Sequence, residues 1–556
     1  MAALSSLEKA RRLIQESRFA HPNRELLMSF LVGSVDENRA ADYLLGVRDS
    51  SGDKIAGLSI VLSRWKSVIA IFKNGIRSRV YEEETVRNIE ARDNVCFITG
   101  TKGSWKDPLV VTEIFPSISG KLKGPLREML AAFLSPEHED FLESQETSAS
   151  QRQAPESNLW LIRSSAARAF SQGFFRVHIK RDTRAIISTA FVETPRSPTI
   201  VRQADYCRVK EIFTSRTAAN LPPPNSIALD ILNRLAHPIR WICLAELIPP
   251  QYAFNQISAP RSVHIGPHTW LSSIRNATIA CMLALWLIFP ISLRTMMYRF
   301  LAYIGSRFFR QSNSFKVQRL PFGMYLKTSS KEWHTSLSNE YKTLDLIRRQ
   351  TDIPVPRPLD LVSDGECTYL LTSRVPGKPI GLCIDLLNDE QLRTFAHDLQ
   401  SCLQDLRSLR RDAALESVIS NTTGKACHDG RICVAVVHDE TDGEFYGPFS
   451  TEDEFNKFLQ SPHIPDVVHR NGHKIVFTHG DINMRNVLVD EKTGRLSGIV
   501  DWESAGWYPG YWEYTKAYFA TRLNWRWSRE VIEVVFKDFG DFSEELDIER
   551  KLWQYC

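Results

Sequence analysis

One loop in the C-terminal half of the 556-residue chain constrains its fold more than any other feature. The loop runs His479-Gly480-Asp481-Ile482-Asn483-Met484-Arg485-Asn486, and Asp501-Trp502-Glu503 begins fifteen residues after Asn486. The spacing H-x-D-x-x-x-x-N places a carboxylate and an amide on one loop, and Asp501 adds a second carboxylate. Phosphoryl transfer needs a carboxylate that orients the attacking hydroxyl and oxygen ligands that hold Mg²⁺ on nucleotide phosphates. The pattern therefore predicts a phosphotransferase catalytic loop followed by a metal-binding turn.

The residues around this loop have the pattern of a strand followed by a hairpin. Residues 474–478 form a short apolar, β-rich run that ends at His479. Residues 486–490 and 496–500 are two further runs on either side of a polar turn, so Asp501 is expected at a strand exit. The alternative is an ordinary hairpin with solvated polar residues. The agreement between motif and context favours the catalytic interpretation.

Two charged residues upstream have the order of a strand lysine and a helix glutamate that together position nucleotide phosphates. Residues 317–327 look like two strands joined by a Pro/Gly turn, and they end at Lys327. Glu340 follows thirteen residues later and opens a run with helical spacing of apolar residues. Each charge alone would more often be a surface residue, but their order before Asp481 favours a Lys327–Glu340 ion pair. No G-x-G-x-x-G loop precedes Lys327.

Residues 296–556 resemble the aminoglycoside phosphotransferase-like family, within the wider protein-kinase-like fold. The motifs that carry the resemblance are, in order, Leu320–Lys327, Ile353–Pro356, His479–Asp481 and Asp501–Pro509. The resemblance implies a bilobal domain that uses ATP and Mg²⁺.

The resemblance also implies a role for each residue of the predicted site. Asp481 corresponds to the catalytic base, and Asn486 and Asp501 correspond to the Mg²⁺ ligands. Lys327 corresponds to the cation on the phosphates, with Glu340 as its partner, as the residue order also predicts. His479 is implied to be a structural buttress of the loop.

The segment after Asp501 bears on the acceptor. Protein kinases carry Asp-Phe-Gly and a long activation segment before Ala-Pro-Glu, whereas this chain reaches Trp507-Tyr508-Pro509 within a few residues. We therefore expect a small-molecule hydroxyl as acceptor, with a protein kinase as an alternative. A second alternative is a pseudoenzyme, a binding module that keeps the fold without transfer.

Aromatic and acidic residues crowd the C-terminal segment. The aromatic residues are Trp507, Tyr508, Tyr511, Trp512, Tyr514, Trp525 and Trp527, and acidic residues are frequent from Asp538 to Glu549. Such residues would suit a cationic hydroxylated acceptor such as an amino sugar. The competing interpretation is that the aromatic residues pack in a helical core and the acids form a solvated face.

Residues 1–205 contain a second pattern, which resembles the fungal branch of the HNH endonuclease family with its ββα-metal unit. A polar turn feeds a predicted strand that ends near residue 100, residues 109–116 form a second strand, and residues 158–162 lead into a helix. Glu113 stands where the first His of the triad belongs, Asn158 matches the Asn, and Ala167 replaces the second His. Because alanine cannot bind metal, the resemblance implies a degenerate domain without nuclease activity. A binding scaffold, a relic and a chain joined from two genes remain open.

Length, charge and cysteine content bear on the number of domains, the partners and the cellular compartment. The chain is too long for one core, so we expect an α+β protein with parts at 1–205, 206–295 as a linker region, and 296–556. The net charge of +4 is too small to indicate nucleic acid as a partner. Ten cysteines without C-x-x-C pairs indicate free thiols and a cytoplasmic protein.

Residues 277–293 carry no charge and predict an apolar helix. Seventeen residues is the lower end of what spans a bilayer. The alternatives are a membrane anchor, a helix buried between domains, and a helix packed on the N-terminal lobe of the kinase-like domain. In the first case the arginines that follow would put the kinase-like domain in the cytosol.

Overall fold

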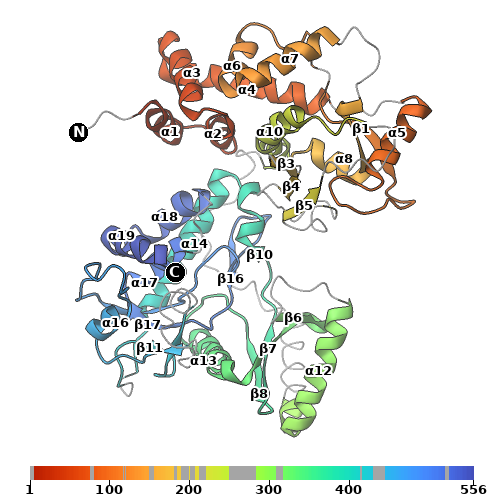
Figure 1. Cartoon of the computed structure of the whole chain (residues 1–556). Coiled ribbons are helices and arrows are strands. Elements are labelled where there is room, and N and C mark those ends of the chain that lie inside the picture. Colours follow the sequence, from red (N-terminus) through yellow and green to blue (C-terminus); the bar gives the residue numbers. More distant parts are fainter. Residues whose placement is uncertain are drawn as a thin grey trace. The chain divides into compact units, whose positions relative to one another are not determined.

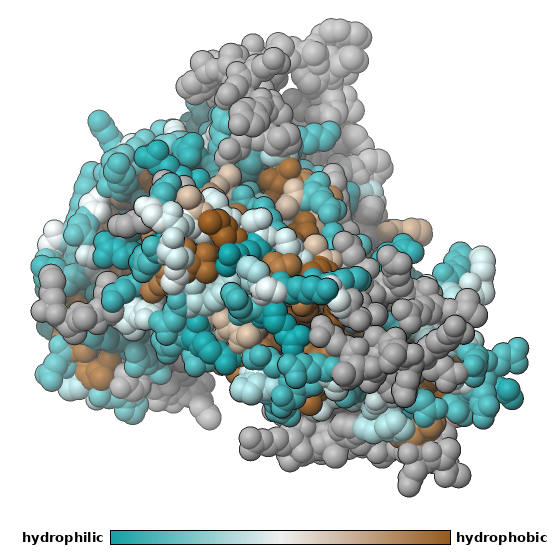
Figure 2. All heavy atoms as spheres, turned by 90° about the horizontal axis from the view of Figure 1, so that it is seen from above, coloured by the Kyte–Doolittle hydropathy of each residue, from teal (hydrophilic) through white to brown (hydrophobic). Residues whose placement is uncertain are grey.

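The protein is described here by a computed structural model that places residues 5–75, 81–116, 118, 120–148, 156–180, 184–189, 200, 207–211, 221–249, 284–308, 317–412, 416–429, 445–519 and 525–555. The chain divides into two compact units, Met1–Pro250 and Gln251–Cys556. Both units combine helices and strands, so the predicted mixed α+β class is confirmed (Figure 1). On the face drawn in Figure 2, hydrophilic and hydrophobic residues are interspersed.

The first unit joins a group of helices to two small antiparallel sheets. Its elements are α1 (Ser6–Glu16), α2 (Asn23–Gly33), α3 (Glu37–Ser50), α4 (Lys54–Gly75), α5 (Glu83–Asp93), β1 (Leu109–Glu113), α6 (Pro125–Phe133), α7 (Pro136–Ser148), β2 (Leu159–Arg163), α8 (Ser164–Ser171), β3 (Phe175–Lys180), β4 (Arg184–Thr189), β5 (Cys207–Glu211) and α10 (Ser226–Ala245). Phe30 of α2 and Trp65 of α4 are fully buried with ring centroids 5.1 Å apart, and they form the centre of the helical group.

The strand–strand–helix order predicted for the first unit is present from β1 to α8. Strands β1 and β2 pair antiparallel, with Glu113 opposite Leu159, and α8 follows β2 directly. The additional strand expected before residue 100 is wrong. The chain turns there instead, because the backbone N–H of Gly100 donates to the carbonyl of Cys96 at 2.7 Å.

The sequence predicts a linker over 206–295, whereas the described part of 207–245 packs into the first unit. Strand β5 pairs with β4, and α10 contacts β3, α2 and α4. The helix forms because Leu229, Leu232 and Leu235 recur at helical spacing, and all three are buried. The boundary between the two units lies at residue 250, whereas the sequence analysis ended the first part at residue 205.

The second unit begins with a helix and a four-stranded antiparallel sheet and continues into a mainly helical part. Its elements are α12 (Ile291–Phe308), β6 (Val317–Leu320), β7 (Met324–Ser330), α13 (His334–Gln350), β8 (Pro358–Ser363), β9 (Cys367–Ser373), β10 (Lys378–Pro379), α14 (Asp389–Ser408), β11 (Ser420–Asn421), β12 (Cys427–His428), β13 (Phe445–Tyr446), α16 (Glu452–Phe458), β14 (Ile475–Thr478), β15 (Val487–Val489), β16 (Leu496–Ile499), β17 (Gly506–Pro509), α17 (Trp512–Phe519), α18 (Glu533–Phe536) and α19 (Ser543–Leu552). The strand order is β6-β7-β9-β8 in the first sheet, and β10-β15-β16 and β11-β17-β14 in two smaller sheets. The predicted hairpin after the His479–Asn486 loop is confirmed as β15 and β16.

The two faces of the first sheet serve different purposes, because neighbouring side chains of a strand point to opposite faces. Leu326 of β7 is buried in an apolar cluster with Tyr298 of α12. The next residue, Lys327, reaches Glu340 of α13. Helix α12 therefore covers one face, and the candidate site lies at the other.

The predicted apolar helix over 277–293 is interrupted in its described part. Residues 277–283 lie outside the described residues, 284–288 are helical, and a bend at Phe289 precedes α12. The break falls at Pro290, which has no N–H to donate and whose ring would clash with the preceding turn. Among the described helices, none is both long and apolar enough to cross a bilayer.

Helix α12 is held on the sheet by one buried carboxylate. Asp360 of β8 accepts a hydrogen bond from the hydroxyl of Tyr298 at 2.7 Å and an ion-paired bond from Arg294 at 2.6 Å. The indole N–H of Trp286 donates to the same tyrosine hydroxyl at 2.8 Å. Asp360 is nearly inaccessible, so its loss would leave several polar groups without their acceptor.

We predict that Asp360→Ala lowers the free energy of unfolding of the second unit by about 3 kcal/mol, because a buried charge loses its partner. Urea denaturation followed by tryptophan fluorescence measures this loss. The matched control is Asp345→Ala, which removes an exposed pair with Arg349 on α13 and should cost about 0.5 kcal/mol. Equal losses for the two variants would contradict the anchoring role of Asp360.

Candidate active site

The loop from His479 to Asn486 leaves β14 at its carboxyl end and leads into β15. Gly480 takes a positive φ of 77°, and a Cβ atom there would lie 2.6 Å from the carbonyl oxygen of Ser504. The loop can approach the segment after Asp501 this closely only because residue 480 is glycine.

His479 links the loop to the strand exit that carries Asp501. Its side chain is fully buried, Nε2 donates to the carbonyl of Val500 at 3.0 Å, and Nδ1 accepts from the backbone N–H of Asp481 at 3.1 Å. Burial lowers the pKa of His479 to about 4, so the imidazole is neutral at pH 7. A neutral ring with both nitrogens engaged is suited to holding the loop in place.

Asp481 and Asn486 lie side by side within the loop. The Asn486 amide donates to the Asp481 carboxylate at 2.7 Å and to the Asp481 carbonyl at 3.0 Å. The side-chain oxygen of Asn483 accepts from the backbone N–H groups of Arg485 and Asn486 and closes the turn. Burial raises the pKa of Asp481 to about 6. The loop thus presents a carboxylate that is more basic than an ordinary aspartate.

Lys327 joins the sheet, helix α13 and the turn after β16. Its ammonium group lies 2.6 Å from the Glu340 carboxylate and also contacts Asp501. Burial alone would lower the pKa of Lys327, but the two carboxylates outweigh burial and raise it. The lysine is therefore charged at pH 7. These two ion pairs bring together residues that lie 174 positions apart.

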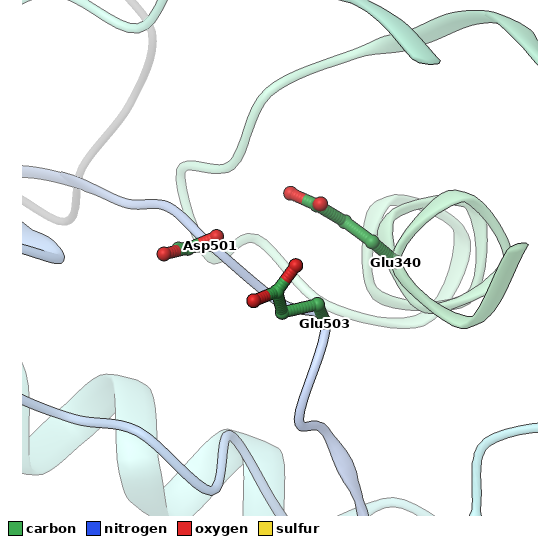
Figure 3. A group of neighbouring side chains, drawn as sticks. All are labelled: Glu340, Asp501 and Glu503. Carbon is green, nitrogen blue, oxygen red and sulfur yellow. The ribbon is translucent and has the colours of Figure 1, made fainter. Parts of the chain in front are cut away.

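Three carboxylates gather around this lysine. Glu340, Asp501 and Glu503 offer oxygen atoms that all lie within 4.8 Å of one another, and Figure 3 shows Glu340 reaching from its helix toward the other two. Hard oxygen donors of this kind are the ligands that Mg²⁺ prefers. If all three are ionised, one lysine leaves the group with a net charge of −2, so the donor set fits a divalent cation.

Asp501 occupies an unusual backbone conformation at this point. Its φ is 69°, in the left-handed region that non-glycine residues seldom adopt. Residues held in this region concentrate at functional sites, where the surrounding structure compensates for the strain. The carboxylate of Asp501 is also paired with Lys327: burial would raise the pKa of Asp501, but the adjacent ammonium group lowers it.

Glu513 of α17 is a site residue that the sequence analysis missed. Its carboxylate is buried and accepts the backbone N–H groups of His479 at 2.5 Å and Gly480 at 3.3 Å. Burial raises the pKa of Glu513 to about 7, and the backbone donors oppose this rise. The sequence signal for Glu513 was an acidic residue within an aromatic helical run. Its hydrogen-bond donor, the backbone N–H of His479, lies 34 positions away.

A second missed feature is a buried ion pair near Asp481. Lys516 of α17 lies 2.5 Å from Asp429, and both side chains are buried. After burial, the charge of Lys516 is the strongest influence on the pKa of Asp481, and it lowers that pKa. The pair therefore sets part of the electrostatic environment of the predicted base.

The aromatic residues near the C-terminus do not form a cation-binding surface. Five of the seven are buried in two apolar cores: Trp507, Tyr508, Tyr511, Trp512 and Trp527. Two of the nearby acids, Glu545 and Glu549, are buried beside His473 and His469. The core interpretation is confirmed for the five aromatic residues, whereas the expected solvated face is wrong for Glu545 and Glu549. These residues give no support for a cationic acceptor.

The predicted nuclease positions make no metal site. Glu113 and Asn158 are buried, and the Asn158 amide binds both backbone groups of Phe115, at 2.8 and 3.0 Å. Asn158 therefore fixes the end of β1. Ala167 on α8 offers no ligand, and the described residues hold one group of candidate metal ligands, which is in the second unit.

A family comparison agrees with the geometry of the second unit. Residues 306–550 match the sequence model of the family described as "Phosphotransferase enzyme family". The C-terminal half is a distant match to this family. The phosphotransferase-like region makes up 245 of the 556 residues, and the predicted nuclease-like domain gains no support from it. The search of curated proteins found no match.

Solved structures similar to the phosphotransferase-like region are aminoglycoside phosphotransferases. One from Streptomyces rimosus, in complex with ADP and streptomycin, is 20% identical, covers 43% of this chain and 90% of its own, and has a TM-score of 0.31. An aminoglycoside-3'-phosphotransferase of type VIII is 18% identical over 44% of this chain and 91% of its own, with a TM-score of 0.31. Identities and TM-scores this low support no statement about activity.

We predict that Glu513→Ala lowers the free energy of unfolding by about 3 kcal/mol, because buried backbone N–H groups lose their acceptor. Thermal or urea denaturation measures the change. Glu544→Ala serves as the control, since Glu544 is exposed and pairs only with the exposed Arg470, and should change stability by less than about 1 kcal/mol. Unchanged stability of Glu513→Ala would show that Glu513 does not hold the loop.

Proposed function

We propose that the second unit transfers a phosphoryl group from ATP to a hydroxyl group of a small molecule, with Mg²⁺ as cofactor. One observation carries this proposal: a charged lysine, an acidic cluster and an Asp–Asn loop converge at one site. Burying Lys327 between two carboxylates contributes little net stability. Such an arrangement is better explained by binding of a polyanion together with a cation.

Each group has a distinct role in the proposed reaction. Lys327 would contact the nucleotide phosphates, with Glu340 holding it in place. Asp501 and Asn486 would hold Mg²⁺, and Glu503 is an additional candidate ligand that lies within 4.8 Å of Asp501. When bound, the ion would offset negative charge on the phosphates.

Asp481 is the proposed base. Its carboxylate, held by the Asn486 amide at 2.7 Å, would accept a hydrogen bond from the acceptor hydroxyl and align its oxygen with the phosphorus. It would take the proton as the new P–O bond forms and the bond from the γ-phosphorus to the bridging oxygen breaks, so that ADP leaves. The neutral His479 and the Glu513 carboxylate would keep the loop in position during this step.

The short path after Asp501 favours a small acceptor over a protein. Only residues 502–505 separate Asp501 from β17, which pairs with β14 and leads to α17. A peptide substrate would need an extended activation segment between these points. Amino sugars and amino alcohols are a first panel of acceptors. The absence of turnover with any hydroxyl compound would favour the pseudoenzyme alternative.

We predict that Asp481→Asn reduces turnover by at least about a hundredfold, because the substituted amide cannot accept the proton. Binding of ATP with Mg²⁺ should change little, since Lys327 and Asp501 remain. Coupled ADP release and a nucleotide thermal shift measure the two effects. Asp490→Asn is the control, because Asp490 is an exposed residue of the neighbouring hairpin turn. Turnover that persists in Asp481→Asn would contradict the assignment.

The pH dependence of turnover provides an independent test. Because burial raises the pKa of Asp481 to about 6, the base is protonated and inactive below that pH. We expect kcat/KM to fall as pH drops through about 6, rather than near the ordinary aspartate value of about 4. An acid limb centred near 4 would contradict a buried carboxylate base.

A further inference from the structure

The exposed apolar residues of this chain are unevenly distributed. Fifteen large apolar side chains are exposed among the described residues, and nine of them fall between residues 285 and 308. These nine are Leu285, Leu287, Ile288, Phe289, Ile291, Met296, Phe300, Tyr303 and Phe308. Isolated exposed apolar residues are ordinary, but a contiguous group marks an interaction surface.

Three of these residues form a stripe along α12. Met296, Phe300 and Tyr303 recur at spacings of four and three, which places them on one side of a helix, and each is more than half exposed. The opposite side of α12 is buried against the sheet through Tyr298. The helix therefore attaches by one face and presents an apolar stripe on the other.

The position of the stripe is fixed by polar contacts between α12 and the sheet. Asp360 binds both Arg294 and Tyr298, and Arg299 binds Asp364 at 2.7 Å.

The family match begins at residue 306, near the end of α12. Almost all of α12 therefore lies outside the residues that match the family.

The charge of this region is as one-sided as its hydropathy. Helix α12 contains three arginines, Arg294, Arg299 and Arg307, and no Asp or Glu. Arg299 and Arg307 are exposed on α12 itself, beside the apolar stripe. A partner for this surface should be apolar and negatively charged.

We propose that α12 and the residues from 284 that precede it form a membrane-docking face that lies on an anionic lipid bilayer. Phe, Met and Tyr side chains would enter the boundary between headgroups and acyl chains, as amphipathic interfacial helices do. The guanidinium groups would remain among the lipid phosphates, because long basic side chains extend their charge toward polar groups.

Charge also distinguishes a bilayer from a second copy of this chain. In a two-fold dimer through α12 the same surface would face itself. The exposed Arg307 groups of the two copies would then repel each other, whereas an anionic bilayer attracts them. The interaction proposed here is peripheral and independent of the phosphotransferase activity.

Vesicle flotation with the full-length protein tests the proposal. We expect the protein to float with phosphatidylcholine vesicles that contain about 30% phosphatidylserine, and much less with phosphatidylcholine alone. The triple variant Met296→Ser, Phe300→Ser, Tyr303→Ser should reduce the bound fraction about tenfold or more. Arg307→Gln should weaken binding to the anionic vesicles only, and salt at about 0.5 M should do the same to the wild type.

The control is Trp105→Ser, which removes an aromatic side chain that is 87% exposed in the first unit, and it should bind as the wild type does. Thermal denaturation should give equal midpoints for the wild type and the triple variant, because the three substituted side chains are exposed. Absence of binding to anionic vesicles, or equal binding by the triple variant, overturns the proposal. So does a concentration-dependent dimer that the triple variant abolishes without any vesicle binding.

Discussion

The buried ion pairs of Lys327 are the interaction on which the candidate site depends. The lysine comes from the sheet, Glu340 from helix α13, and Asp501 from the turn after the β15–β16 hairpin. A buried charge without a partner is costly. The sheet, helix α13 and the turn must therefore meet for Lys327, Glu340 and Asp501 to be paired. The same contacts place the acidic cluster beside the Asp481 loop. The ammonium group of Lys327 therefore both holds these elements together and forms part of the candidate site.

A second set of contacts holds the loop itself. The Glu513 carboxylate accepts backbone N–H groups at the start of the loop, and His479 spans from the loop to Val500. Both side chains are buried and hydrogen-bonded, and a buried polar group that loses its hydrogen-bond partner is costly. This support holds Asp481 in position for its proposed role as the base. The Lys516–Asp429 pair then adjusts how readily Asp481 takes up a proton.

Sequence reasoning was most successful where the signal was local. The strands around Lys327, the helix of Glu340 and the hairpin before Asp501 follow from apolar periodicity and turn residues, and all are present. Glu513 and the Lys516–Asp429 pair were missed because their partners are 34 and 87 positions away. The apolar run of 277–293 misled for a different reason: composition suggested one helix, but a single proline divides it. Most helices of the first unit gave no motif at all.

The central claim is that the Lys327 cluster binds the phosphates of a nucleotide with a divalent cation. Calorimetric titration of ATP into the full-length protein, with and without Mg²⁺, tests it most directly, using wild type and Lys327→Met. We expect Mg²⁺-dependent binding by the wild type and affinity at least about tenfold weaker in a folded Lys327→Met variant, since a phosphate contact is lost. Binding that is absent from the wild type, or unaffected by both Mg²⁺ and the substitution, would contradict the account.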